Sequence, residues 1–138
     1  MRKIGSLIRI QKWRVDEERR KVADLERLAA EMDERAAGLA REVAAESLAA
    51  GRSYEAARGY DAYVRATLDR RAKLEHSRAE LETRIAAARE ALSEAFEELK
   101  RYEITAERAA QAAQAAAARR AQIGLDEMAA DRIRRGTL

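Results

Sequence analysis

The stretch from Leu74 to Leu99 carries apolar residues that return every three and four positions. The members of this stripe are Leu74, Leu81, Ile85, Ala88, Leu92, Ala95 and Leu99. Glu, Arg and Lys fill most of the positions between them, which is the pattern of a coiled-coil strand. Because so narrow a stripe cannot bury itself, it requires a second helix lying along it.

Residues 1–50 supply this partner helix, which comes first in the chain. One seam position recurs every seven residues and the other lies between, and together they hold Ile4, Ile8, Val15, Val22, Leu25, Ala29, Met32, Ala36, Leu39, Val43 and Ala50. Gln11, Glu18 and Glu46 also fall in phase. Polar seam residues weaken packing but help to fix the register of the two helices.

The repeat is interrupted at residues 51–59, which contain Gly51, Ser53 and Gly59. This interruption predicts the apex of a hairpin. Glycine is favoured in the left-handed position that ends a helix, so Gly51 is expected there. Ser53 is expected to cap the helix that follows.

The second helix is predicted over residues 60–133, followed by a short tail at 134–138. Arg71 and Arg78 lie in phase with its seam, so the seam near the apex should be loose. Folding about residue 55 places Ile4 near position 106, so the helix from about 107 onward should project as an overhang of about 40 Å. The predicted fold is therefore all-α, an antiparallel two-helix coiled-coil hairpin with a longer second helix. Whether the hairpin is a monomer or exchanges arms with a second copy stays open.

Composition agrees with this class. Charged residues make up 38% of the chain and aromatic residues 4%, and proline is absent, which argues against a compact globule. No apolar run approaches the length that crosses a bilayer, and no secretory signal is expected. The net charge of +3 is small beside 28 basic and 25 acidic residues, so most of this charge should be a solvated helix surface.

No catalytic constellation is present. Cysteine is absent and His76 is the only histidine, which excludes thiolate and His-pair metal sites. The glycines form no phosphate-binding motif, and a helical hairpin offers no deep pocket. We therefore expect no enzyme activity, no cofactor and no metal.

Two aromatic features stand out from the charged surface. Tyr54, Tyr60 and Tyr63 lie near the apex, either in ordinary packing or as a contact patch. Trp13 lies off the seam, where it either packs on the opposite helix near residues 95–99 or anchors a partner.

Basic residues gather at both ends of the chain. They are Arg2, Lys3, Arg9, Lys12 and Arg14 at one end and Arg132, Arg134 and Arg135 at the other. Such residues suit nucleic acid, anionic lipid or an acidic protein groove. Nucleic acid is the least supported, because no stacking aromatics are interleaved with the C-terminal arginines.

Four local patterns, in this order and spacing, resemble the FliJ family of flagellar export proteins. They are the opening Leu7-Ile8-Arg9-Ile10-Gln11-Lys12-Trp13-Arg14-Val15-Asp16-Glu17-Glu18, then Tyr60-Asp61-Ala62-Tyr63-Val64, then Lys100-Arg101-Tyr102-Glu103, and last Leu125-Asp126-Glu127-Met128-Ala129 followed by Arg132. The resemblance covers nearly the whole chain, and the last pattern is the most specific.

The resemblance implies a coiled coil similar to the axial gamma subunit of rotary ATPases. It implies docking into the ring of the flagellar export ATPase, FliI, contact with the export gate protein, FlhA, and recycling of export chaperones. Carried over by position, the ATPase-binding residues are Trp13, Arg14, Leu125, Asp126, Glu127 and Arg132. Tyr60 and Tyr63 would face the export gate.

The expected function is a non-enzymatic stalk and adaptor of the flagellar type III export apparatus. It would work in the cytoplasm, at the periphery of the inner membrane and without insertion into it. The alternatives are a generic coiled-coil scaffold or dimerisation module, and a basic helical protein that binds nucleic acid.

Overall fold

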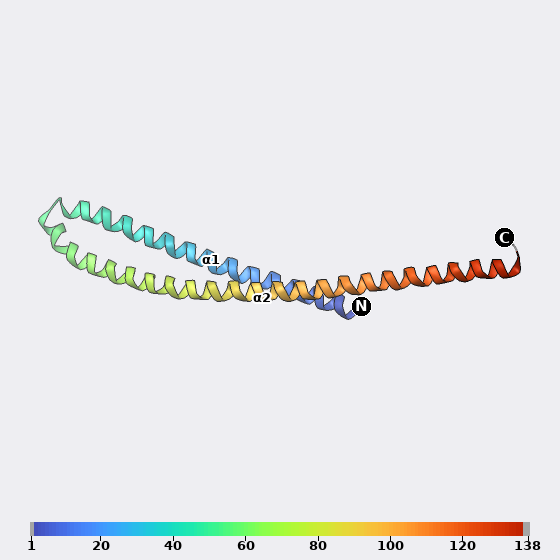
Figure 1. The fold of residues 1–138 in the computed structure, drawn as a ribbon. Coiled ribbons are helices and arrows are strands. Elements are labelled where there is room, and N and C mark those ends of the chain that lie inside the picture. Colours follow the sequence, from blue (N-terminus) through green and yellow to red (C-terminus); the bar gives the residue numbers. More distant parts are fainter. Residues whose placement is uncertain (1, 137–138) are drawn as a thin grey trace. The chain divides into compact units, whose positions relative to one another are not determined.

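The computed structural model describes residues 2–136 and shows two helices (Figure 1). Helix α1 spans Arg2–Ala50, with 49 residues, and helix α2 spans Tyr54–Arg135, with 82 residues. The described residues contain no strand. The predicted fold class, an all-α coiled-coil hairpin with a longer second helix, is confirmed.

The chain divides into two compact units. One comprises residues 14–95 and is here called the hairpin unit. The other combines residues 2–13 with residues 96–136 and is here called the end unit. No helical segment in the described part of the chain is long and apolar enough to cross a membrane.

In the hairpin unit, α1 and α2 run antiparallel. Ion pairs join the helices, among them Arg78 with Asp33 at 3.0 Å and Arg89 with Glu26 at 2.9 Å. From the first pair to the second, the residue number decreases along α1, from 33 to 26, and increases along α2, from 78 to 89. The two helices therefore run in opposite directions.

The core of the hairpin unit is the predicted seam. Ala29, Leu81 and Ile85 are buried together, and Leu25, Leu28 and Met32 pack against them. Val15 and Ala95 are also buried. Removing this apolar surface from water is the main favourable term that holds the two helices together.

The turn of the hairpin unit is short. Ala50 is the last residue of α1 and Tyr54 the first of α2, so residues 54–59 of the expected apex are helical. The Ser53 hydroxyl accepts a hydrogen bond from the Ala56 amide at 3.0 Å, which confirms the predicted cap.

The expectation for Gly51 is wrong. Among the described residues, only Gly136, after the last turn of α2, has a positive φ, of 67°. The Arg52 amide instead bonds to the Ala49 carbonyl at 3.1 Å, so α1 ends in a tight turn without a left-handed residue.

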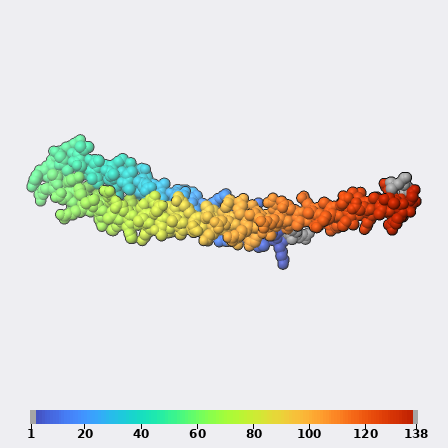
Figure 2. Space-filling model, viewed as in Figure 1, coloured from blue at the N-terminus to red at the C-terminus, as the bar shows by residue number. Residues whose placement is uncertain are grey.

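In the end unit, residues 2–13 of α1 lie beside the part of α2 that begins at Phe96. Gln11 and Leu99 are buried there, and Ile4 and Ile8 are half-buried. From Glu107 to Gly136, by contrast, no residue is buried. This part of α2 is a single exposed helix, coloured orange to red in Figure 2.

Candidate protein-binding surfaces

The described residues contain no group of three or more His, Cys, Asp or Glu side chains that could hold a metal ion. His76 is exposed and lies 3.0 Å from Glu80, one turn further along α2. Three surfaces instead combine exposed apolar side chains with charged ones.

The first surface lies at the start of α1. Trp13 has 65% of its area exposed, so the alternative in which it packs on the opposite helix is wrong. Ile10 and Leu7 are exposed beside it, one turn apart along α1. The seam residues Ile8 and Gln11 occupy the other side of the helix, where they are half-buried or buried. Arg14, the other residue proposed here for ATPase binding, is half-buried and belongs to the hairpin unit.

The second surface is the last part of α2, here called the tip, residues 119–135. Its large apolar residues Ile123, Leu125, Met128 and Ile133 are all exposed. At about 100° per residue, Leu125 and Met128 point to one side of the helix and Ile123 points to nearly the opposite side. Ile133 lies between them, about 80° from both Leu125 and Ile123. The tip therefore presents apolar side chains around much of its circumference.

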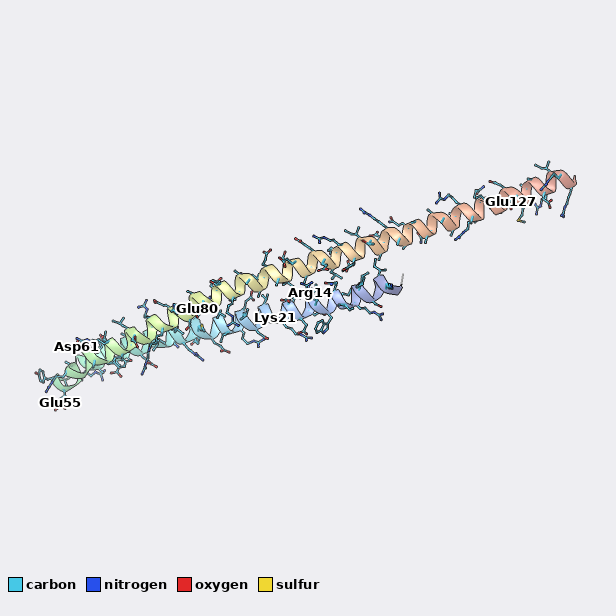
Figure 3. All side chains as sticks on the ribbon, turned by 90° about the horizontal axis from the view of Figure 1, so that it is seen from below. Arg14, Lys21, Glu55, Asp61, Glu80 and Glu127 are labelled. Carbon is cyan, nitrogen blue, oxygen red and sulfur yellow. The ribbon has the colours of Figure 1, made fainter. Side chains whose placement is uncertain are left out.

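Charged residues surround these apolar side chains. Asp126 accepts a hydrogen bond from Gln122 at 3.0 Å, and Asp131 pairs with Arg135 at 3.2 Å. Glu127 is exposed on the part of α2 that has no helix beside it (Figure 3), and Arg132 is exposed as well. Leu125, Asp126, Glu127 and Arg132 thus lie together within two turns.

The first surface and the tip are not brought together. Both belong to the end unit, but the segment Arg2–Trp13 lies beside α2 well before the red C-terminal end in Figures 1 and 3. The residues proposed for ATPase binding therefore form separate surfaces and no single cluster.

The third surface is a groove between α1 and α2 in the hairpin unit, with a volume of about 830 Å³. Its apolar lining comes from both helices and comprises Met32, Leu39, Val43, Val64, Leu68 and Leu74. Arg71 and Arg78 lie along it, at the two in-phase positions where the sequence predicts a loose seam. The groove agrees with that prediction, since the seam residues that line it, Leu39, Val43, Val64 and Leu74, are only half-buried.

The charges at the groove are held within the unit. Arg78 donates one hydrogen bond to Asp33 and a second to Glu82 at 2.7 Å. These hydrogen bonds raise the pKa of Arg78 above its ordinary value, and the one to Asp33 has the largest effect. Arg71 donates to Glu75 at 3.0 Å. Because arginine is already charged at neutral pH, these contacts position the side chains and give no pH switch.

The three tyrosines near the turn differ in exposure. Tyr54 is largely exposed, while Tyr60 and Tyr63 are half-buried on α2. Tyr60 lies fourteen residues before Leu74 and is therefore in phase with the seam, and Tyr63 directly precedes Val64, which lines the groove. The Tyr63 carbonyl accepts a hydrogen bond from Thr67, which is buried.

Sequence reasoning missed parts of two surfaces. Leu68 lines the groove although it lies off the seam, and its apolar character beside an in-phase Arg71 was the available signal. Ile10 and Leu7 accompany Trp13 at intervals of three residues, so the helical period alone places them together.

Comparison with known protein families gives one match for this chain. Residues 1–137 match the family described as "Flagellar FliJ protein". No curated protein sequence and no solved structure gives a significant match.

Proposed function

The chain belongs to the FliJ family of flagellar proteins, and on that premise we propose that it is a non-enzymatic stalk and adaptor of the flagellar type III protein export apparatus. In this proposal it binds the ring of the export ATPase, promotes ring assembly or cycling, and couples the ring to the export gate and to export chaperones. It acts in the cytoplasm, at the periphery of the inner membrane.

The observation that carries the proposal is the exposed end of α2. From Glu107 to Arg135 the helix continues without a buried residue. A lone helix of this kind is narrow enough to enter the pore of a ring, with a diameter of about 10–12 Å including side chains. Its apolar side chains are distributed around much of the helix, which suits a binding site that surrounds it.

The residues proposed for the ATPase are Leu125, Asp126, Glu127 and Arg132 at the tip, with Trp13 and Arg14 on α1. Exposed apolar side chains ringed by charge support modest, reversible contacts, because charged rim residues add little affinity. Such contacts suit a partner that must turn or cycle.

The residues proposed for the export gate are Tyr60 and Tyr63. Tyrosine is enriched in interface hot spots, since it adds a large apolar face and a hydroxyl at low entropic cost. Both tyrosines lie within one turn of Val64 on α2, and Val64 lines the groove. A gate contact here would lie in the hairpin unit, whereas the tip belongs to the end unit.

The first prediction concerns the tip and ATPase activity. Adding the full chain to the flagellar export ATPase should raise its rate of ATP hydrolysis, measured as phosphate release. A chain that lacks residues 120–138 should return the rate to that of the ATPase alone. Because none of the described residues it removes is buried, the truncated chain should keep its remaining helix, measured by circular dichroism.

A pair of point variants distinguishes a contact at the tip from the general effect of replacing an exposed apolar residue of α2. Leu125→Ser should reduce the stimulation, while Ile104→Ser, which changes another exposed residue of α2, should leave it intact. Equal stimulation by the truncated and full chains would refute the role of the tip. Absence of both stimulation and a complex on size-exclusion chromatography would refute the stalk proposal.

A second candidate is a coiled-coil scaffold or dimerisation module, and the groove favours it. The groove, lined by the seam residues Leu39, Val43 and Val64 and by the off-seam Leu68, offers apolar surface to a helix of a second copy. Sedimentation equilibrium over a range of concentrations distinguishes the two candidates, since a dimer through the groove should be lost in Leu68→Glu. The third candidate, a nucleic-acid binder, has no observation in its favour beyond the terminal basic residues.

A further inference from the structure

The first turns of α1 carry a charge pattern that helix stability does not explain. Residues 2–14 include five basic residues and no acidic one, and the first acidic residue is Asp16. Because the start of a helix is the positive end of its dipole, acidic residues are favoured there and basic ones are not. Helix α2 follows this rule, with Glu55 in its first turn and three arginines in its last.

Three of these five basic side chains have no acidic partner among the described residues. Lys3, Arg9 and Lys12 are exposed, and none of them pairs with an acidic residue in the part of the chain that the structure describes. Arg9 has only a long hydrogen bond, of 3.4 Å, to Ser6 in the preceding turn. These cations are therefore available to an anionic partner.

Apolar side chains lie among these cations. Leu7, Ile10 and Trp13 follow one another at intervals of three residues, with 40%, 57% and 65% of their areas exposed. At about 100° per residue they cover an arc of about 120° that faces away from the seam. Lys3 falls within this arc and Arg9 lies at its edge. We call these five residues the N-terminal face.

We propose that the N-terminal face binds the surface of an anionic lipid bilayer. A helix that lies in a membrane interface has Trp, Leu or Ile on one face, with Lys and Arg beside them to reach the lipid phosphates. Tryptophan favours this depth because its ring is apolar and its indole N–H is polar. The helix already exists in the folded chain, so binding does not have to order it.

The mixture of side chains favours lipid over nucleic acid. Non-specific binding to a duplex depends on cations that contact phosphates and gains nothing from exposed Leu7 and Ile10. A bilayer uses both sets, since the cations meet the headgroups while the apolar side chains enter the boundary below them.

This inference goes beyond the proposed function and is tested without the ATPase. The proposed function uses Trp13 and Arg14 of α1 together with the tip, whereas the bilayer meets the N-terminal face. Because only Trp13 is common to both, variants of the other four residues of the face should lose lipid binding and keep the stimulation of ATP hydrolysis. Leu125→Ser should do the opposite.

Trp13 is the only tryptophan of the chain and is therefore a built-in probe. The full chain is titrated with vesicles of phosphatidylcholine containing phosphatidylglycerol, and the emission of Trp13 is recorded. We expect the emission to move to shorter wavelength and to be quenched by brominated acyl chains, with neither effect in pure phosphatidylcholine. High salt should reverse both effects, because the attraction to the headgroups is screened.

Two variants assign the binding to the N-terminal face while keeping the probe. K3Q/R9Q should weaken binding on the order of 25-fold, from about fivefold per cation removed near an anionic surface. The control R84Q/R108Q makes the same change in net charge at exposed arginines of α2 and should bind as the parent chain does. Ile10→Ser, which keeps all the cations, should weaken binding on the order of tenfold.

Three results would overturn the proposal. One is an unchanged emission with anionic vesicles while circular dichroism shows the chain to be helical. The second is equal loss of binding in the control and in K3Q/R9Q, which would mean attraction by net charge alone. The third is a salt-sensitive change with duplex DNA and none with vesicles, which would assign the N-terminal face to nucleic acid.

Discussion

At the scale of single residues, burial along the seam decides what each side chain contributes. Leu81 has 3% of its area exposed and packs with Ala29 and Ile85, whereas Leu48 has 73% exposed. The two leucines lie on helices of the same hairpin unit. They therefore form a matched pair for measuring what the seam adds to stability.

Leu81→Ala should lower the free energy of unfolding by about 2–4 kcal/mol, because it removes buried methyl groups and leaves a cavity. Leu48→Ala should change it by less than about 0.5 kcal/mol. Both values come from urea unfolding followed by circular dichroism. Similar losses in the two variants would mean that the seam is not the core of the fold.

Gln11 shows the opposite situation, a polar residue in the seam of the end unit. It has 9% of its area exposed, and its Oε1 atom is buried without a hydrogen-bond partner. A buried acceptor without a partner lowers stability, because it has lost its hydrogen bonds to water. Polar seam residues often persist because they fix the register.

Gln11→Leu should therefore raise the free energy of unfolding by about 1–2 kcal/mol. Gln114→Leu, at an exposed position of α2, should change it by less than about 0.5 kcal/mol. Thermal and urea unfolding of both variants measure this. A loss of stability in Gln11→Leu would show that Oε1 does find a partner in solution.

At the scale of elements, the start of α2 depends on one side chain. Ser53 accepts a hydrogen bond from the Ala56 amide, and its own carbonyl accepts one from Ala57. The side-chain bond satisfies one of the four amides that a helix start leaves without a partner. The three-residue turn leaves few other groups to do so.

Ser53→Ala should lower the free energy of unfolding by about 1 kcal/mol through the loss of this cap. The same substitution at Ser93, an exposed position within α2, should raise it by about 0.5 kcal/mol, because alanine is the better helix former. The opposite signs of two chemically identical changes are the result to look for in urea unfolding. Equal effects would contradict the capping role.

At the scale of the whole molecule, buried surface is unevenly distributed along α2. Its buried apolar residues lie between Leu81 and Leu99, and from Glu107 to Gly136 none is buried. A helix without tertiary packing is only marginally stable, even when it is rich in alanine. Different parts of one continuous helix should therefore open at different rates.

Amide hydrogen exchange followed by mass spectrometry should show this gradient. Peptides from residues 81–92 should be the slowest to exchange, and those from 110–135 should exchange close to the rate of an isolated helix. Addition of the export ATPase should then slow exchange at 120–135 selectively. Uniform protection along α2 without a partner would contradict the description of the tip as unpacked.

Part of this molecule follows from the sequence alone. The heptad spacing of Leu81, Ile85, Ala29 and their neighbours predicts two helices and the seam between them, because helical period is a local property of the chain. Glycine and serine between the repeats predict the turn and its cap. The FliJ resemblance, carried by motifs such as Leu125-Asp126-Glu127-Met128-Ala129, is likewise a property of the sequence and agrees with the family match.

Other features are decided only by the tertiary structure. The sequence leaves open whether Trp13 packs or points outward, and it does not show that Gln11 is buried with Oε1 unpaired. It predicts a loose seam at Arg71 and Arg78 but not the groove of about 830 Å³ beside them. The reason is physical: periodicity fixes which side of a helix a residue occupies, whereas burial depends on how closely a second helix approaches that side.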